Sequence, residues 1–222
     1  MSPELIVFDL NKTLIKENSW RDLNLAMGVT PAEDAELMEQ ARRGEITDAE
    51  GQAELIKIYQ QRGDVSRPNV EKILWQYTYM PYARDVVSEL RKRGYNLAIV
   101  SGAMDILVQH VATELQITWW RSSNRFIFDE NDQLIQIQSP EKDTSDKLCQ
   151  LQQLVGELSI ALADCMVIGD GANDAALFQA TGNGVTFTDS PIVDDARWVV
   201  DDLSGVLSIE VEIGRASCRE RV

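Results

Sequence analysis

Basic side chains are scarce in this chain of 222 residues. It has 21 Lys and Arg against 36 Asp and Glu, which gives a net charge of −15 at pH 7 and an isoelectric point near 4.4. Nucleic acids and anionic membranes are bound through clusters of basic residues, because these offset the phosphate charge. The composition therefore excludes both classes of surface, and we expect neither a nucleic-acid nor a membrane partner.

Long apolar runs, cysteine and histidine are also lacking. No apolar segment approaches the roughly 18 residues of a membrane span, and no basic region precedes Leu5, as it would in a signal peptide. The cysteines Cys149, Cys165 and Cys218 lack metal-ligand spacing, and the lone His110 lies in an apolar helical pattern. We therefore expect a cytoplasmic protein with reduced cysteines and a structural histidine.

Short, continuous apolar runs do occur, at residues 5–8, 97–100 and 165–168. Such runs are typical of parallel strands buried on both faces. Each is followed by polar residues: Asp9, the pair Ser101-Gly102, and the loop Gly169–Asp174. Open α/β sheets bind ligands at the carboxyl ends of their strands. We therefore predict a Rossmann-like parallel sheet with these residues along one edge.

Lys147 belongs to a further segment with a helical pattern. Its apolar residues recur at helical spacing, at Leu148, Leu151, Val155 and Leu158. Thr144 or Ser145 is the candidate N-cap. Considered alone, Asp9 or the pair Ser101-Gly102 would be an ordinary set of turn residues, and Lys147 would be an ordinary solvated helix residue. Their order along the chain, ending in Gly-Asp-Gly-Ala-Asn-Asp, is what indicates a shared site.

This order resembles the haloacid dehalogenase superfamily, in its phosphoserine-phosphatase-like branch, over residues from Glu4 to about Leu207. The resemblance implies that Asp9 is the nucleophile that becomes a phosphoaspartate. It implies that Ser101, the Gly102 amide and Asn173 bind the phosphoryl group, and that Lys147 neutralises charge. Fixed donors and a cation would suit the attack of one anion on another.

The resemblance also implies a Mg²⁺ ion, held by Asp9, the main-chain carbonyl of Asn11 and Asp170, with Asp174 completing the loop. Mg²⁺ prefers oxygen ligands and often takes only one or two carboxylates. The expected function is a Mg²⁺-dependent phosphatase that acts on a small phosphorylated metabolite. The sequence leaves the oligomeric state open.

Asn11 departs from the family pattern, which usually has an aspartate there as general acid and base. An amide does not exchange protons at neutral pH, and such help is worth about two to four decades of rate. Three accounts stay open. The substrate could be an acyl phosphate, whose leaving group needs no acid. Glu17 could replace the missing aspartate as the acid, and it is also a candidate substrate ligand. Or the protein could be a weak enzyme or a binder of Mg²⁺ and a phosphorylated ligand without useful turnover.

The predicted organisation is an α/β core of residues 1–14 and 82–211, interrupted by a helical cap of residues 15–81. Residues 126–128 and 134–135 predict a β-hairpin. Within the cap, Asn18 and Leu55 stand where phosphoserine phosphatases carry a glutamate and an arginine for the substrate, which puts phosphoserine itself in question. Residues 212–222 resemble a translated adapter sequence, and we predict that they are non-native.

Overall fold

One twisted sheet forms the centre of the protein. The computed structural model describes residues 3–139 and 146–209. Within them the strands form one seven-stranded sheet in the order β4-β3-β2-β1-β5-β6-β7, in which every neighbouring pair is parallel except β3 and β4. The strands are β1 Leu5–Phe8, β2 Asn96–Met104, β3 Trp119–Phe128, β4 Leu134–Gln138, β5 Cys165–Ile168, β6 Gly184–Phe187 and β7 Trp198–Val200. The predicted α/β class with a Rossmann-like sheet is confirmed.

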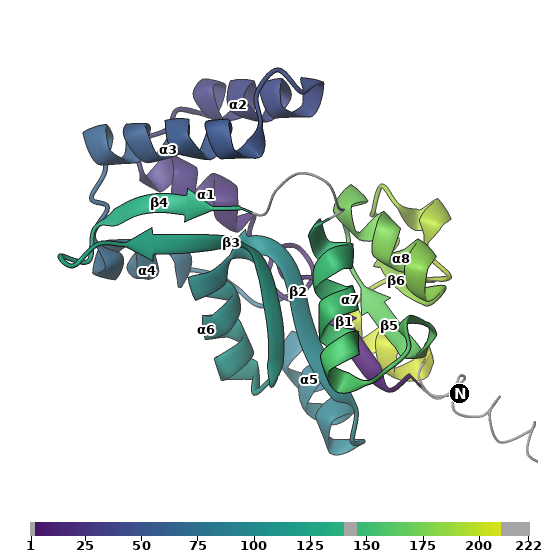
Figure 1. Cartoon of the computed structure of the whole chain (residues 1–222). Coiled ribbons are helices and arrows are strands. Elements are labelled where there is room, and N and C mark those ends of the chain that lie inside the picture. The colour runs from purple at the N-terminus through teal and green to yellow at the C-terminus, as the bar shows by residue number, and fades with distance from the viewer. Residues whose placement is uncertain (1–2, 140–145, 210–222) are drawn as a thin grey trace, which may run out of the picture.

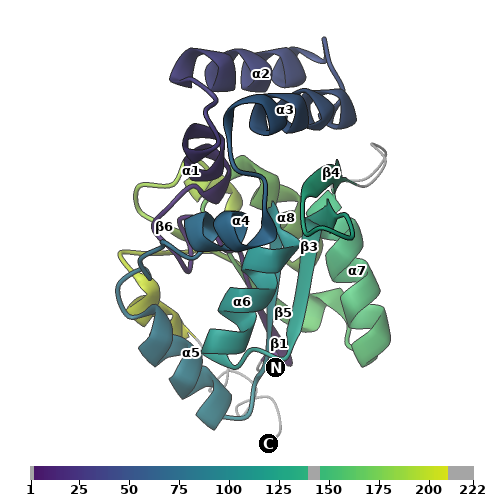
Figure 2. The ribbon, with the colours of Figure 1, turned by 90° about the vertical axis from the view of Figure 1, so that its left-hand side faces the viewer.

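Helices cover both faces of this sheet (Figures 1 and 2). Ile6 and Phe8 of β1 pack into the cluster that includes α5 (Ala83–Lys92) and α6 (Asp105–Leu115). Leu5 and Val7 pack into the cluster that includes α7 (Asp146–Leu158) and α8 (Ala175–Thr181). Because alternate side chains of a strand point to opposite faces, a central strand needs an apolar residue at every position. Short 3-10 helices follow as η1 Leu162–Asp164, η2 Ala172–Asp174, η3 Val193–Asp195 and η4 Leu203–Gly205.

Four helices lie between β1 and α5 in the chain: α1 Ser19–Ala26, α2 Pro31–Arg43, α3 Asp48–Arg62 and α4 Arg67–Leu74. Both ribbon views place α2 and α3 beyond the top edge of the sheet, with α1 and α4 nearer to it. Two linkers join this block to the sheet, and they pair with each other. The amide of Lys16 donates to the Thr78 carbonyl and that of Met80 to the Leu14 carbonyl, both over 2.9 Å. The exact domain limits at residues 14/15 and 81/82 stay a prediction.

The second strand of the sheet is longer than its apolar run. We predicted that the strand would end before Ser101-Gly102, but β2 continues to Met104. The reason is its partner β3, which pairs Ser101 with Ser122 and, after a register shift, Met104 with Asn124. Ser101 and Gly102 therefore lie in an irregular part of β2. Strand irregularities of this kind re-aim side chains near functional sites.

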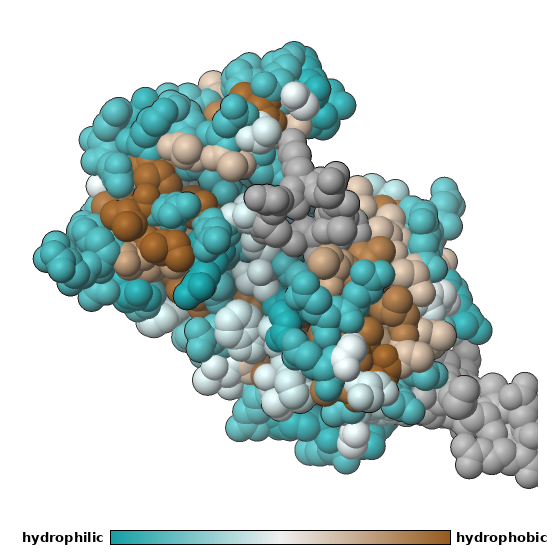
Figure 3. All heavy atoms as spheres, in the orientation of Figure 1, coloured by the Kyte–Doolittle hydropathy of each residue, from teal (hydrophilic) through white to brown (hydrophobic). Residues whose placement is uncertain are grey.

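The predicted hairpin forms, with Phe126 opposite Ile137 in β3 and β4. The candidate N-caps Thr144 and Ser145, Cys218 and the predicted non-native tail lie outside the described residues. Among residues 3–139 and 146–209, no helix has the length and apolar character needed to cross a membrane. Figure 3 shows a mostly hydrophilic face with separate hydrophobic areas, one at the left, where Figure 1 draws the β3–β4 hairpin, and one at the right.

The contact between β6 and α8 makes a first prediction. A Cβ on Gly184 would lie 2.3 Å from Cγ of Phe178, a buried side chain. Gly184→Ala must displace that ring, so we expect a loss of about 1–3 kcal/mol in the free energy of unfolding. Gly156→Ala is the matched control, because nothing lies within 4 Å of the new Cβ. There a helical alanine should stabilise by about 0.5–1 kcal/mol. Urea unfolding checks both, and equal stability of the two variants would refute the close packing.

Candidate active site

A buried lysine joins two of the predicted site segments. Asp9 follows β1, and its amide donates to the Ile168 carbonyl at the end of β5 over 2.9 Å. Lys147, in the first turn of α7, places Nζ 2.8 Å from Asp9 Oδ1 and 2.7 Å from Asp174 Oδ1. The lysine is 3% exposed. Three segments that are distant in the chain therefore meet at the carboxyl edge of the sheet.

The charge of Lys147 is maintained by its neighbours. Burial alone would lower the pKa of its ammonium group, but the nearby Asp9 and Asp174 carboxylates outweigh burial and raise it. The side chain therefore stays protonated at neutral pH. Its bond to Asp174 has hydrogen-bond geometry. The contact with Asp9 has only the distance of an ion pair, since Asp9 Oδ1 is buried without a well-aligned hydrogen-bond donor among the described residues.

Three carboxylates crowd this point. Oxygens of Asp9, Asp170 and Asp174 all lie within 4.8 Å of one another. Burial, and then the charge of Asp9, raise the pKa of Asp170 and raise that of Asp174 to about 6. Like charges so close are tolerated when a cation lies among them. A set of three carboxylates, all of them oxygen donors, fits a hard divalent cation such as Mg²⁺.

Two of the three carboxylates, Asp170 and Asp174, accept hydrogen bonds from neighbouring groups. Thr13 Oγ1 donates to Asp170 Oδ1 over 3.3 Å, and the Gly171 amide donates to Asp174 Oδ2 over 3.2 Å. Both Asp174 oxygens therefore have donors. The loop also needs glycine at position 169, because a Cβ there would lie 2.4 Å from the Asp174 carboxylate. The role of Thr13 was not predicted from the sequence, although Thr13 follows Asp9 by four residues.

The second strand brings the predicted phosphate-binding groups to the same region. Ser101 is buried, and its Oγ accepts from the Ala103 amide over 3.2 Å. A Cβ on Gly102 would lie 4.0 Å from Asn173 Nδ2, so the Asn173 amide faces the Gly102 backbone. The Gly102 carbonyl accepts from Trp20 Nε1 over 2.9 Å and from Asn124 Nδ2 over 2.7 Å. These last two contacts were not predicted from the sequence.

Asn11 and Glu17 have other partners. The Asn11 side-chain oxygen accepts from the Ser19 amide, at the start of α1, over 3.2 Å. Both oxygens of Glu17 lie 2.9 Å from the Thr78 amide, which donates to them from the second linker. The Glu17 carboxylate is thus held by the linker main chain. This placement argues against the two roles we predicted for it, as a stand-in acid and as a substrate ligand.

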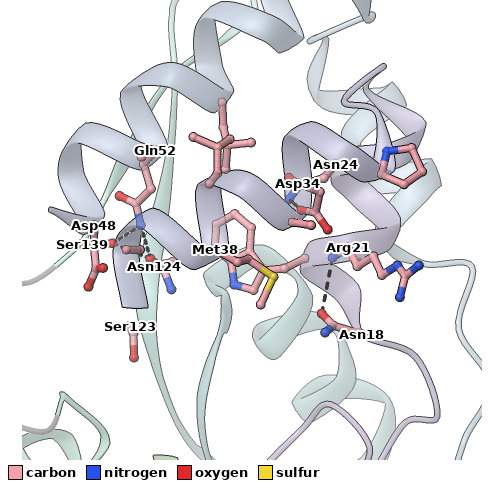
Figure 4. A pocket seen from close by; sticks show the side chains of 17 residues that line it. Asn18, Arg21, Asn24, Asp34, Met38, Asp48, Gln52, Ser123, Asn124 and Ser139 are labelled. Atoms are coloured by element: carbon pink, nitrogen blue, oxygen red, sulfur yellow. Dashed lines mark hydrogen bonds between the residues drawn. The ribbon is translucent and has the colours of Figure 1, made fainter. Parts of the chain in front are cut away.

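A cavity of about 650 Å³ lies between α1, α2, α3 and the middle of β3 (Figure 4). Its lining includes Asn18 and Leu55, the two cap positions at which we expect the substrate contacts to differ from those of phosphoserine phosphatases. Trp20 and Asn124, which hold the Gly102 carbonyl, also line it. The cavity and the predicted phosphate-binding strand therefore share a wall.

Residues 3–182 match the family model described as a hydrolase, haloacid dehalogenase-like hydrolase. The chain belongs to this family. The predicted superfamily and enzyme class are therefore confirmed: the protein is a haloacid dehalogenase-like hydrolase. The matched region contains Asp9, Ser101, Lys147 and Asp170, all four of the predicted site segments.

Several phosphoserine phosphatases are similar to this haloacid dehalogenase-like hydrolase. That of Streptococcus thermophilus is 29% identical over 95% of this chain and 97% of its own length. That of Albidiferax ferrireducens is 30% identical over 83% and 78%. A solved phospho-aspartyl intermediate analogue of phosphoserine phosphatase superposes with a TM-score of 0.76 at 25% identity, over 94% of this chain and 99% of that one. The phosphoserine-phosphatase-like branch is confirmed.

The buried ion pairs predict an asymmetric response to mutation. Lys147→Met leaves Asp9 and Asp174 buried without their cation, so we expect a loss of about 3–5 kcal/mol in the free energy of unfolding, measured without divalent metal. Lys57→Met is the control, because it removes an exposed pair with Glu54 and should have no measurable effect. If Lys147→Met unfolds at the same urea concentration as the parent, the lysine does not hold the acids together.

Proposed function

We propose that this hydrolase is a Mg²⁺-dependent phosphatase that cleaves a small phosphomonoester through a phosphoaspartate, the acyl phosphate formed at Asp9. The observation that carries the proposal is the buried Asp9 carboxylate, at a strand end, beside the Lys147 ammonium and the Asp170 carboxylate. The relatives named as phosphoserine phosphatases, and the phospho-aspartyl analogue of one of them, support it.

Each side chain has a defined part in this reaction. A carboxylate oxygen of Asp9 attacks phosphorus, and the bond between phosphorus and the leaving oxygen breaks. Lys147, Ser101 Oγ, the Gly102 amide and the Asn173 amide would offset charge on the phosphoryl oxygens. Water then attacks the phosphoaspartate, which releases inorganic phosphate and restores Asp9.

The carboxylates of Asp9 and Asp170 and the Asn11 carbonyl would hold the metal directly. A bound Mg²⁺ would neutralise charge between Asp9 and the incoming phosphoryl group. Asp174 would contribute less as a ligand, because Lys147 and the Gly171 amide already donate to its oxygens. Its part in the proposal is to position Lys147 against Asp9.

The proton supply is the weak point of this site. An alkoxide leaving group must take up a proton, and the water that attacks phosphoaspartate must lose one. Asn11 offers an amide, whose oxygen accepts from the Ser19 amide. We therefore propose slow turnover of alkyl phosphates. Acyl phosphates should lose their leaving group faster, because it departs as a stable carboxylate.

The same contact favours a second candidate function. If Asn11 serves to fix α1 rather than to move protons, the protein could bind Mg²⁺ and a phosphorylated ligand without useful turnover. Calorimetry with Mg²⁺ and beryllium fluoride would then show saturable binding in a protein that hydrolyses none of the esters offered. Sustained turnover of any phosphate ester rules this candidate out.

Asp9 is the first residue to test. We expect the parent, with Mg²⁺, to release phosphate from acetyl phosphate and more slowly from small alkyl phosphates. Asp9→Ala should lose at least about two decades of this rate, because no other carboxylate can form the intermediate. Chelation of the metal with EDTA should have a comparable effect, reversed by added Mg²⁺. Equal phosphate release by parent and Asp9→Ala would remove Asp9 from the mechanism.

Asn11→Asp tests the proton supply. The new carboxylate can accept from the Ser19 amide as the amide oxygen does, so we expect the fold to be kept. Hydrolysis of alkyl phosphates should rise by about two decades or more, whereas the first step with acetyl phosphate should gain less. Assays need saturating Mg²⁺, because another carboxylate adds like charge beside Asp9.

The control for this test is Asn11→Ala, which removes the amide without adding an acid and should not become faster. If Asn11→Asp binds Mg²⁺ yet stays as slow as the parent, position 11 does not limit the reaction.

A further inference from the structure

The cavity above the sheet edge is large for the leaving group of a small amino-acid ester. Its volume of about 650 Å³ lies in the range of sites that enclose drug-sized ligands. Asn18, Trp20 and Leu55 line it, and Figure 4 shows Met38 and Asn124 in the same space. A serine-sized group would leave most of this volume to water.

The cavity lies where the leaving group of a phosphate ester would reach. Trp20 and Asn124 bind the Gly102 carbonyl from the cavity side, over 2.9 and 2.7 Å. Gly102 also faces Asn173 and follows Ser101. One peptide group thus separates the proposed phosphate site from the cavity.

The chemistry of the wall is mainly apolar, with one polar end. Pro31, Ala35, Leu37, Met38 and Ala41 contribute from α2. At the polar end, Gln52 Nε2 donates to Asn124 Oδ1 over 2.8 Å and also to Ser139 Oγ. Gln52 Oε1 is itself buried, so it is closed to a molecule in the cavity, and the polar end is already hydrogen-bonded within the protein.

The charged groups of the wall do not favour a second anion. Asp34 accepts from Asn24 Nδ2 over 2.6 Å, and Tyr59 in turn donates to Asn24. Asp48 adds another carboxylate, and Arg21 is a single exposed cation. Two acids against one exposed base would repel a carboxylate, and a lone solvated arginine holds one weakly.

We infer that the substrate is the phosphate ester of a neutral, largely apolar, ring-sized alcohol. The inference rests on the proposed phosphatase function and names its substrate class. The ring would lie along Trp20 and the apolar side of α2. An amino acid such as serine, with its carboxylate and small volume, fits this cavity poorly.

Two alkyl phosphates test the inference, because their leaving alcohols have similar intrinsic reactivity. They are O-phosphoserine and 2-phenylethyl phosphate. With Mg²⁺ and the Asn11→Asp protein, we expect kcat/KM for 2-phenylethyl phosphate to be about tenfold or more above that for O-phosphoserine. The difference measures the contribution of the apolar cavity.

Two tryptophan substitutions on α2 locate the effect. Both alanines are exposed, but Ala35 lines the cavity, whereas Ala32, one turn earlier on the same helix, is outside the lining. Ala35→Trp should lower kcat/KM for 2-phenylethyl phosphate at least about tenfold more than for acetyl phosphate, which does not reach the cavity. Ala32→Trp should change neither value.

The outcomes separate the two proposals. Absence of Asp9-dependent turnover of both alkyl phosphates and of acetyl phosphate overturns the phosphatase function and this inference with it. Asp9-dependent turnover in which O-phosphoserine is the preferred ester, or in which Ala35→Trp and Ala32→Trp behave alike, overturns the inference and leaves the phosphatase function standing. The expected order of esters together with a selective loss in Ala35→Trp supports both.

Discussion

The site depends on one buried cation. Lys147 lies between two carboxylates that come from different segments, and it is itself almost out of contact with water. Burial of any one of these charges alone would be unfavourable, so each is stable only while the others are in place. This mutual dependence ties the start of α7 to the ends of β1 and β5. It explains why the acids converge although they repel one another.

The parts of the fold that the sequence predicted are those set by burial. Leu5–Phe8 and Cys165–Ile168 read as continuous apolar runs because both faces of a central strand are covered. The polar residues that follow these strands therefore meet at one edge of the sheet. The position of Gly102 inside β2 was not predictable from the local sequence, because the length of β2 depends on its pairing with β3.

The helical block shows where periodicity fails. In α2 only Asp34 is buried, so the helix has no apolar stripe from which the sequence could predict it. What stabilises its start is a capping box, in which Thr30 and Glu33 exchange hydrogen bonds. Glu17 shows the opposite limit: its sequence neighbourhood suggested the active site, yet its carboxylate binds a main-chain amide 61 residues later. Contacts of that range are not encoded in any local pattern.

The paired linkers have a consequence for motion. Two separate tethers would let the helical block swivel about each of them, but here residues 14–16 and 78–80 are joined by main-chain hydrogen bonds and by the bridge between Ile15 and Tyr79. Glu17 adds a side-chain bond across the same junction. The block is also joined to the β3–β4 hairpin, where the Arg67 amide donates to the Asp132 carbonyl and the Leu134 amide to the Val65 carbonyl. With contacts at both places the helices cannot swivel freely about the linkers, and Trp20 is held against the Gly102 carbonyl.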